Sequence, residues 1–204
     1  MQTRLIEPIT GDALLIVDVQ KDFLPGGALA VPQGEEVIEP LNRWIEHFHA
    51  AGLLIIATRD WHPPNHCSFD GSCRNRSEGE SPWPVHCVAE TEGAEFPAEL
   101  ALPKETLVVS KGMQPEQEAY SGFQGTNLAT RLHKRGIERL FVGGLATDYC
   151  VLETVLDALR EGFQVFLIRD AVRAVNRQPG DGGRAIRQMQ ESGALLVHTR
   201  DLAT

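Results

Sequence analysis

Six short apolar runs, each separated from the next by a longer amphipathic segment, constrain the fold of this chain more than any other feature. Within each run the apolar residues follow one another without alternating with polar ones. This pattern is typical of parallel strands that are buried on both faces of a sheet. The six predicted strands span residues 13–19, 53–59, 106–110, 139–144, 164–170 and 194–200.

The segments between these runs carry apolar residues at helical spacing. In residues 35–52, Val37, Leu41, Trp44 and Phe48 recur every three or four positions, and a glycine ends the pattern. Alternation of strand and helix predicts an α/β fold, namely a three-layer, doubly wound domain with a mostly parallel six-stranded sheet and right-handed crossovers. The other predicted helices lie within residues 126–136, 148–162 and 184–193.

We expect a single domain over residues 1–204. A chain of 204 residues is long enough for one substantial core, and the sequence shows no repeat and no linker. Residues 60–105 depart from the regular alternation, because they are irregular and rich in proline, glycine and serine. A loop of this length inside a compact domain is usually functional or disordered.

Charge and composition narrow the classes of partner. The net charge of −9, with no basic stripe, argues against nucleic acid. The first residues lack the apolar core of a secretory signal, and the longest apolar runs are too short to cross a bilayer. Four cysteines without such a signal indicate a reducing compartment, so we expect a cytoplasmic protein. A small-molecule substrate is the expected partner, and self-association into a homo-oligomer is left open.

Polar side chains stand at the carboxyl ends of four successive predicted strands. Asp18 ends the first, Asp60 follows the second, Lys111 follows the third and Cys150 comes shortly after the fourth. In an open parallel sheet the carboxyl ends meet at one edge, where ligands bind. We therefore expect the four groups to converge on one cleft.

Cys150 is the candidate nucleophile. Thr147 is a plausible N-cap, which would place the Cys150 thiol in the first turn of a helix, where the helix dipole favours a thiolate. The same N–H groups could hold an oxyanion. The alternative is a small buried apolar residue on a helix, which is the commoner role of a lone cysteine.

Asp18 and Lys111 complete a candidate catalytic set. A buried acid at the end of a strand is normally paired or serves as a base with an adjusted pKa. Asp18 could instead be a capping or loop-bonding residue, and Lys111 could extend outward from the strand end to water. Taken together, they suggest Asp18 as proton acceptor, Lys111 as cation and Cys150 as nucleophile.

The segment after the second strand, "RDWHPPNH", predicts a metal site. Asp60 and His62 are two residues apart, so in an extended chain both side chains point the same way, and the two prolines keep the chain extended. With His86 they would provide one carboxylate and two imidazoles, a set that suits one divalent ion of zinc, iron or manganese alike. Zinc is the metal that we expect. The histidines could instead be surface loop residues.

Cys67, Cys73 and Cys87 could form a structural zinc cluster with nearby histidines. Their spacing, however, contains no C-x2-C or C-x4-C pair. We therefore expect three ordinary free thiols.

At this point several motifs together resemble a known family. They are "LLIVDVQKDFLPGGALAVP", "TRDWHPPNHCSF", "WPVHC", "SKG", "EAYSGF" and "GGLATDYCVLETVLDA", and they run from about residue 12 to residue 175. In this order they resemble the nicotinamidases (pyrazinamidases) of the isochorismatase-like cysteine hydrolases. The resemblance implies the isochorismatase-like hydrolase fold and conversion of nicotinamide to nicotinate and ammonia in NAD salvage, with pyrazinamide also accepted.

The resemblance also implies roles for individual residues. The metal would bind the pyridine nitrogen and orient the ring. The implied set is a catalytic triad of Asp18, Lys111 and Cys150, metal ligands Asp60, His62 and His86, and ring-binding aromatic residues Phe23, Trp83 and Tyr120.

A cis peptide between Leu145 and Ala146 is implied as well, and it would aim the N–H groups of Ala146 and Cys150 at the oxyanion. In the implied mechanism Asp18 takes the thiol proton, the sulfur attacks the carboxamide carbon, ammonia leaves, and water cleaves the thioester.

The chain departs from the family pattern in residues 70–81, a polar stretch with an extra Cys73. This departure puts the local loop geometry and the pocket lid in doubt. His66 occupies a position where some members use an additional ligand and others do not, so its role is left open.

Two other functions are considered. A related cysteine amidohydrolase acting on a carbamoyl or ureido substrate is the nearest alternative, and the Asp60, His62 and His86 set favours nicotinamide over it. A non-enzymatic metal or redox module is the second, and it predicts unfolding when metal is removed. Dinucleotide binding is not expected, since no G-x-G-x-x-G turn follows the first strand.

Overall fold

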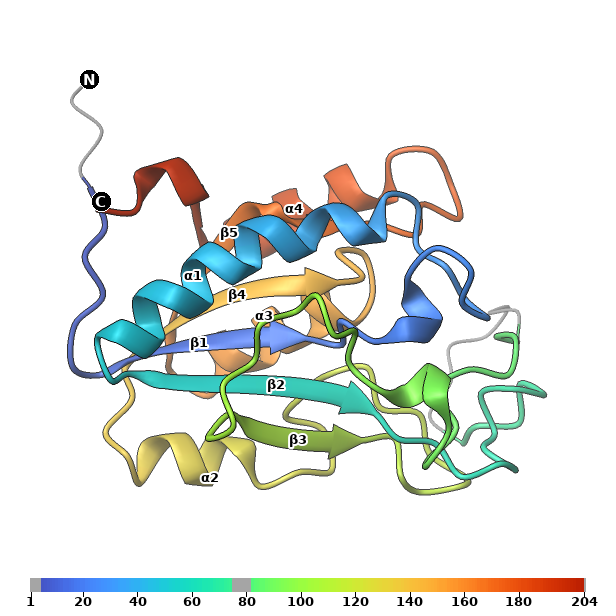
Figure 1. Ribbon diagram of the computed structural model, residues 1–204. Helices are drawn as coiled ribbons and strands as arrows, with labels where there is room; N and C mark the ends of the chain where they lie inside the picture. Colours follow the sequence, from blue (N-terminus) through green and yellow to red (C-terminus); the bar gives the residue numbers. More distant parts are fainter. Residues whose placement is uncertain (1–4, 75–81, 204) are drawn as a thin grey trace.

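The computed structural model describes residues 5–74 and 82–203, and in these residues six parallel strands form one sheet (Figure 1). The strand order is β3-β2-β1-β4-β5-β6, and all five neighbouring pairs are parallel. The strands are β1 (Asp12–Val17), β2 (Leu54–Asp60), β3 (Leu107–Lys111), β4 (Arg139–Leu145), β5 (Gln164–Arg173) and β6 (Leu195–Val197).

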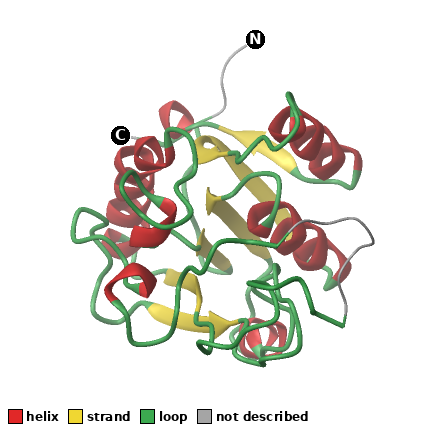
Figure 2. Ribbon diagram, turned by 90° about the vertical axis from the view of Figure 1, so that its right-hand side faces the viewer, coloured by secondary structure: helices red, strands yellow, loops and turns green. Residues whose placement is uncertain are grey.

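Helices cover both faces of this sheet. The helix α1 packs on one face, and α2, α3 and α4 pack on the other, as their separate hydrophobic clusters show (Figures 1 and 2). The three-layer, doubly wound α/β fold predicted from the sequence is therefore confirmed. The helices are α1 (Ile38–Ala50), α2 (Leu128–His133), α3 (Cys150–Arg160) and α4 (Asp181–Glu191).

The strand β1 illustrates why the apolar runs are continuous. Successive side chains of a strand point to opposite faces of the sheet. Leu14 and Ile16 accordingly join the cluster beneath α1, and Ala13, Leu15 and Val17 join the cluster beneath α3. All six residues of the strand are buried, and the one polar residue among them, Asp12 at the start of the strand, is paired with Arg139.

The chain winds outward in one direction from β1 to β3 and in the other from β4 to β6. The reversal lies between β1 and β4, and in such sheets ligands bind outside the carboxyl ends at the reversal. At this edge Gly144 has φ +125, and a Cβ there would lie 2.1 Å from the carbonyl oxygen of Val17. Because glycine has no Cβ, Gly144 allows β4 to lie this close to β1 at the carboxyl edge of the sheet.

The predicted boundaries differ from the observed ones by a few residues. The first strand ends at Val17 because Asp18 has φ +48, which takes it out of the strand. The last strand is only Leu195–Val197, and a short 3-10 turn, Thr199–Asp201, follows it. Within the described residues, no helix combines the length and the apolar character needed to cross a membrane.

Candidate active site

The four polar groups predicted to converge do converge. Asp18 directly follows β1, Asp60 and Lys111 are the last residues of β2 and β3, and Cys150 is the first residue of α3. Asp60 and Lys111 are direct neighbours in the sheet register. All four are almost fully buried, with Asp18 0% exposed and Lys111 1%.

Lys111 lies at the centre of the group. Its Nζ lies 2.9 Å from Asp18 Oδ2 and 2.5 Å from Asp60 Oδ1, and 3.4 Å from Cys150 Sγ. It also donates to the Ala119 carbonyl at 3.0 Å. Burial alone would lower the pKa of Lys111, but the two carboxylates outweigh it and raise the pKa well above its usual value. Lys111 is therefore a permanent cation beside the thiol.

Asp18 has the position and the environment of a proton acceptor. Burial raises its pKa, and the positive charge of Lys111 opposes this rise. Thr58 Oγ1 donates a 2.7 Å hydrogen bond to Asp18 Oδ1, which fixes the carboxylate. A carboxylate oxygen of Asp18 and Cys150 Sγ lie within 4.8 Å of each other. A raised pKa brings a carboxylate closer to the range useful for general-base catalysis at neutral pH.

The expected activation of Cys150 by a helix cap is corrected in two respects. Thr147 does not cap the helix: the N-cap residue is Tyr149, without a side-chain cap, and the Thr147 N–H donates to the Arg173 carbonyl of β5 at 2.8 Å. Burial also raises the pKa of the Cys150 thiol well above its usual value, and the opposing effect of Lys111 does not cancel this rise. The resting sulfur therefore carries its proton and needs a base.

The turn before α3 has the backbone conformation that the resemblance implied. The peptide between Leu145 and Ala146 is cis. Ala146 and Cys150 both line one cavity, together with Asp60, His62 and His86.

Asp60, His62 and His86 form a compact set of metal donors. Their ligand atoms lie within 4.8 Å of one another, and all three residues are buried, so the histidines are not surface loop residues. The Nδ1 of His62 faces the Gly112 carbonyl at 2.9 Å, and that of His86 faces the Pro84 carbonyl at 2.7 Å. Metal-binding histidines usually have one ring nitrogen anchored in this way, which leaves Nε2 for the ion.

The charges around this set suit a divalent cation. Burial would raise the pKa of Asp60, but Lys111, His62 and His86 outweigh it and hold the pKa far below its usual range. The carboxylate is thus ionised. Burial also lowers the pKa of His86, which favours the neutral imidazole that metals bind. One carboxylate and two imidazoles fit zinc, iron or manganese.

His66, whose role was left open, does not belong to this set. Its Nδ1 lies 2.8 Å from Ser68 Oγ, and its Nε2 lies 3.1 Å from the Gln117 carbonyl oxygen. The ring packs against His62, with 4.1 Å between the centroids. His66 therefore packs against the His62 ring and supports its position.

Gln20 is a site residue that sequence reasoning missed. The side chain is fully buried and clamps the end of β2, because its Oε1 accepts the Asp60 N–H at 2.8 Å and its Nε2 donates to the Asp60 carbonyl at 2.8 Å. Nε2 also donates to the Ala94 carbonyl at 2.9 Å. A glutamine three residues after the end of a strand gives no spacing signal, so only the fold reveals this role.

Gly112 allows a first testable prediction about the metal donors. It has φ +64, and a Cβ added there would lie 2.5 Å from Cε1 and 2.7 Å from Nδ1 of His62. Gly112→Ala should therefore displace the ring and lower zinc affinity about 10- to 100-fold, the usual effect of disturbing a residue behind a ligand. Competition with a chromophoric chelator measures this.

Gly136→Ala is the matched control for this substitution. Gly136 has φ +66, and nothing lies within 4 Å of an added Cβ. Both variants carry the same backbone strain, roughly 1–2 kcal/mol, but only one disturbs His62. Equal zinc affinity in the two variants would contradict the predicted role of Gly112.

A cavity opens beside Cys150 and the metal donors. Aromatic rings surround it: Trp83 Nε1 donates to the Tyr120 hydroxyl at 2.9 Å, and the Trp83 ring packs edge-on against Tyr149 with centroids 4.9 Å apart. Phe23 contacts His86 at a centroid distance of 5.6 Å. Sequence reasoning missed Glu118 and Tyr149. The lining residues are Phe23, Leu29, Val31, Asp60, His62, Trp83, His86, Glu118, Tyr120, Ala146, Tyr149, Cys150 and Val175.

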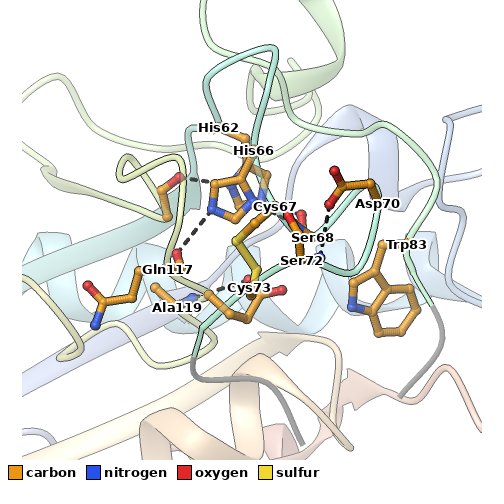
Figure 3. Close-up of a disulfide and its surroundings, with 12 residues drawn as sticks. His62, His66, Cys67, Ser68, Asp70, Ser72, Cys73, Trp83, Gln117 and Ala119 are labelled. Carbon is orange, nitrogen blue, oxygen red and sulfur yellow. Dashed lines mark hydrogen bonds between the residues drawn. A yellow bond between two sulfur atoms is a disulfide. The ribbon is translucent and has the colours of Figure 1, made fainter. Parts of the chain in front are cut away.

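The prediction of three free thiols is wrong for two of them. Cys67 and Cys73 form a disulfide at the start of the loop beside His66 (Figure 3). The loop folds back on itself, which brings together two cysteines whose spacing alone suggests no pairing. Cys87 is free and fully buried, and burial raises the pKa of its thiol, so it remains protonated. Of the segment 70–81, residues 75–81 lie outside the described part of the chain.

Comparison with known proteins agrees with this geometry. The isochorismatase domain model matches residues 12–201. The nicotinamidase of Escherichia coli (strain K12) is 42% identical, with 93% of this chain and 95% of the relative covered.

Two solved structures have the same fold. The pyrazinamidase of Pyrococcus horikoshii in complex with zinc is 47% identical with a TM-score of 0.83, covering 92% of this chain and 99% of that one. A protein of L. infantum in complex with nicotinate is 36% identical with a TM-score of 0.83, covering 95% of this chain and 96% of that one. The chain belongs to the isochorismatase family.

Proposed function

We propose that the protein is a nicotinamidase, which hydrolyses nicotinamide to nicotinate and ammonia and also accepts pyrazinamide. The observation that carries this proposal is the juxtaposition of Asp18, Lys111 and Cys150 with a metal-donor set beside one aromatic cavity. The zinc-bound pyrazinamidase and the nicotinate-bound relative add the matching substrate chemistry. The reaction belongs to nicotinamide salvage toward NAD.

The catalytic group consists of Asp18, Lys111 and Cys150, and each has a separate role. Cys150 is the nucleophile, and Asp18 removes its proton as the sulfur attacks the carboxamide carbon. Lys111 stays protonated and stabilises the negative charge that moves between carboxylate and sulfur. Asp18 then protonates the departing ammonia and activates the water that cleaves the thioester.

The surrounding residues orient the substrate. Backbone N–H groups of Ala146 and Cys150 are placed to hold the oxyanion, since both residues line the cavity. Phe23, Trp83 and Tyr120 sandwich the ring, and the hydrogen bond between the last two keeps their planes in place.

Asp60, His62 and His86 would hold one divalent ion, with zinc preferred. When bound, the ion acts as a Lewis acid that binds a ring nitrogen and orients the carboxamide. The carboxylate of Asp60 also contacts Lys111, so the donor set and the catalytic group share one residue.

The proposal is tested by assaying nicotinate and ammonia release by the purified protein. Nicotinamide, pyrazinamide and an N-carbamoyl amino acid should be compared at equal concentration. Preference for the carbamoyl substrate would favour the related amidohydrolase, because that reaction needs no ring nitrogen near the metal donors.

Metal removal gives a second prediction. Dialysis against a chelator should abolish activity while leaving the circular dichroism spectrum unchanged, because the three donors are buried in a fold that packing already holds in place. Adding zinc should restore activity. Unfolding upon chelation would instead indicate a structural metal module.

We propose a single domain acting in the cytoplasm, whose main partner is the small-molecule substrate. One sheet supplies residues to both hydrophobic clusters, and this supports one domain. In a reducing compartment the Cys67–Cys73 disulfide would exchange with thiol reductants. Formation of a homo-oligomer is open to measurement by light scattering.

A further inference from the structure

His66, Cys67 and Cys73 form a second compact cluster of ligand atoms, separate from the metal donors described above. One ring nitrogen and the two sulfurs lie within 4.8 Å of one another, and all three residues are buried (Figure 3). The proposed reaction uses none of them. The cluster therefore needs an explanation of its own.

Backbone hydrogen bonds hold the two cysteines together independently of the disulfide. The Cys67 carbonyl accepts the N–H groups of Gly71 at 2.9 Å and Ser72 at 3.0 Å, which closes the loop on itself. The Cys67 N–H donates to the Pro115 carbonyl at 2.8 Å and ties the loop to its neighbour. After reduction the two sulfurs would therefore stay adjacent.

His66 has the form that a metal ligand takes. The His66 side chain is buried, and one of its ring nitrogens lies within 4.8 Å of both sulfurs. The Ser68 N–H points at Nδ1 from 3.3 Å, which makes Nδ1 the acceptor nitrogen and Nε2 the N–H that donates to the Gln117 carbonyl. The Ser68 hydroxyl lies 2.8 Å from the same Nδ1, so an ion bound at Nδ1 would replace the hydrogen bond from this hydroxyl. A neutral ring with one nitrogen anchored on a carbonyl is typical of ligating histidines.

We propose that, once the disulfide is reduced, Cys67, Cys73 and His66 bind a borderline-soft divalent ion such as Zn²⁺. In the reduction, a dithiol transfers two electrons and two protons to the disulfide and is itself oxidised to a disulfide. The two protein thiols then release two protons as they bind the ion as thiolates. Two thiolates and one imidazole are a known ligand set for zinc, with water or another donor in the fourth position.

Geometry and charge both permit this site. With Zn–S bonds of about 2.3 Å at tetrahedral angles, the sulfurs need a separation of roughly 3.8 Å, a small opening of the closed loop. Two thiolates neutralise the two charges of the ion, so the second site adds no net charge beside His62 and His86. A second cation near the first is then electrostatically acceptable.

The site would also preserve the wall of the substrate cavity. Phe69, in the same loop, packs against His62 and His86 with centroid distances of 5.7 and 5.6 Å. The Ser68 carbonyl accepts the Trp83 N–H at 2.9 Å. A covalent link in the oxidised chain and a metal link in the reduced chain would hold the same loop.

Cobalt titration of the wild-type protein tests the proposal without any substitution. The oxidised protein should bind one equivalent of Co²⁺. Protein reduced with a phosphine under argon should bind two, and the second should add a sulfur-to-cobalt charge-transfer band in the near ultraviolet. Cys150 and Cys87 are free in both samples, so the difference spectrum reports Cys67 and Cys73. A reduced protein that binds only one equivalent, with no new band, overturns the proposal.

Variants separate the two sites. Reduced Cys67→Ser and Cys73→Ser should each lose the second equivalent and its band, and His86→Gln should lose the first equivalent and keep the second. Retention of the thiolate band in Cys67→Ser would overturn the proposal. Loss of the nicotinamidase activity would not bear on this result, because the second site shares no ligand with Asp60, His62 and His86.

Discussion

Replacing Cys150 with alanine should abolish ammonia release from nicotinamide while the protein stays folded. Removal of a nucleophile from a coupled catalytic group typically costs about 10⁴-fold or more in kcat. Alanine removes only one sulfur from a site where the helix and both neighbouring strands are held by their own packing. The expected result is no measurable turnover, unchanged circular dichroism and retained zinc binding.

Serine at position 150 separates chemistry from packing. Serine has nearly the same shape as cysteine, so Cys150→Ser should fold like the wild type, but its hydroxyl is much harder to deprotonate than a thiol. Its activity should also be very low. Quenching the wild-type reaction in acid should trap a covalent acyl adduct by mass spectrometry, and neither variant should show one.

Cys87→Ala is the matched control, because Cys87 is also a free, buried cysteine. It should keep activity within a few-fold of wild type. If Cys150→Ser retained substantial activity, or if Cys87→Ala lost as much as Cys150→Ala, then Cys150 would not be the nucleophile.

The convergence behind this prediction could be deduced from the sequence because of how parallel sheets are built. Strands buried on both faces need unbroken apolar runs, and β1 and β4 show such runs clearly. Once the strands are located, the carboxyl ends must meet at one edge. Asp18, Lys111 and Cys150 were therefore predictable from their positions next to strand ends.

What could not be predicted depends on loops, whose path no periodicity describes. The Cys67–Cys73 pair forms because a short loop closes on itself, and nothing in their spacing indicates this. The Thr147 hydroxyl does not cap α3. Instead, the Thr147 N–H donates a hydrogen bond to the carbonyl of Arg173, because β5 extends as far as that residue. Gln20 clamps β2 through contacts that exist only after the sheet has formed.

The effect of burial on the pKa of Cys150 was also not predicted from the sequence. A position at the start of a helix favours the thiolate, but the sulfur also faces the carboxylates of Asp18 and Asp60 in a water-poor site. Burial and like charge raise the pKa, so the site needs Asp18 as a base and not only a helix dipole.

Replacing Lys111 with methionine should have the largest effect on stability. Lys111 is the counter-ion of both Asp18 and Asp60 and is 1% exposed. Methionine preserves much of the side-chain volume but leaves two buried carboxylates facing each other. Loss of one partner from a buried ion pair typically costs about 3–5 kcal/mol. Urea unfolding of the metal-free protein should show this loss of stability. The zinc-loaded variant should also be inactive.

The loss of stability in Lys111→Met should become smaller as the pH is lowered. Without Lys111 the pKa of Asp18 in the folded state rises further above its unfolded value, because burial and Asp60 both raise it. A raised acid pKa destabilises the folded state when the pH lies above that pKa, and the penalty disappears as the pH falls toward the unfolded value. The gap between variant and wild type should therefore narrow as the pH is lowered from neutral.

A second substitution tests whether charge causes the loss. Lys111→Met combined with Asp18→Asn removes one of the two uncompensated carboxylates, so it should recover part of the free energy of unfolding without recovering activity. Lys134→Met, at an exposed position after α2, is the control and should change stability by about 0.5 kcal/mol or less. A loss at Lys111 no larger than at Lys134, or a double variant less stable than Lys111→Met alone, would show that Lys111 does not hold the two carboxylates together. In that case the arrangement of the catalytic group would need another source of stability than this cation.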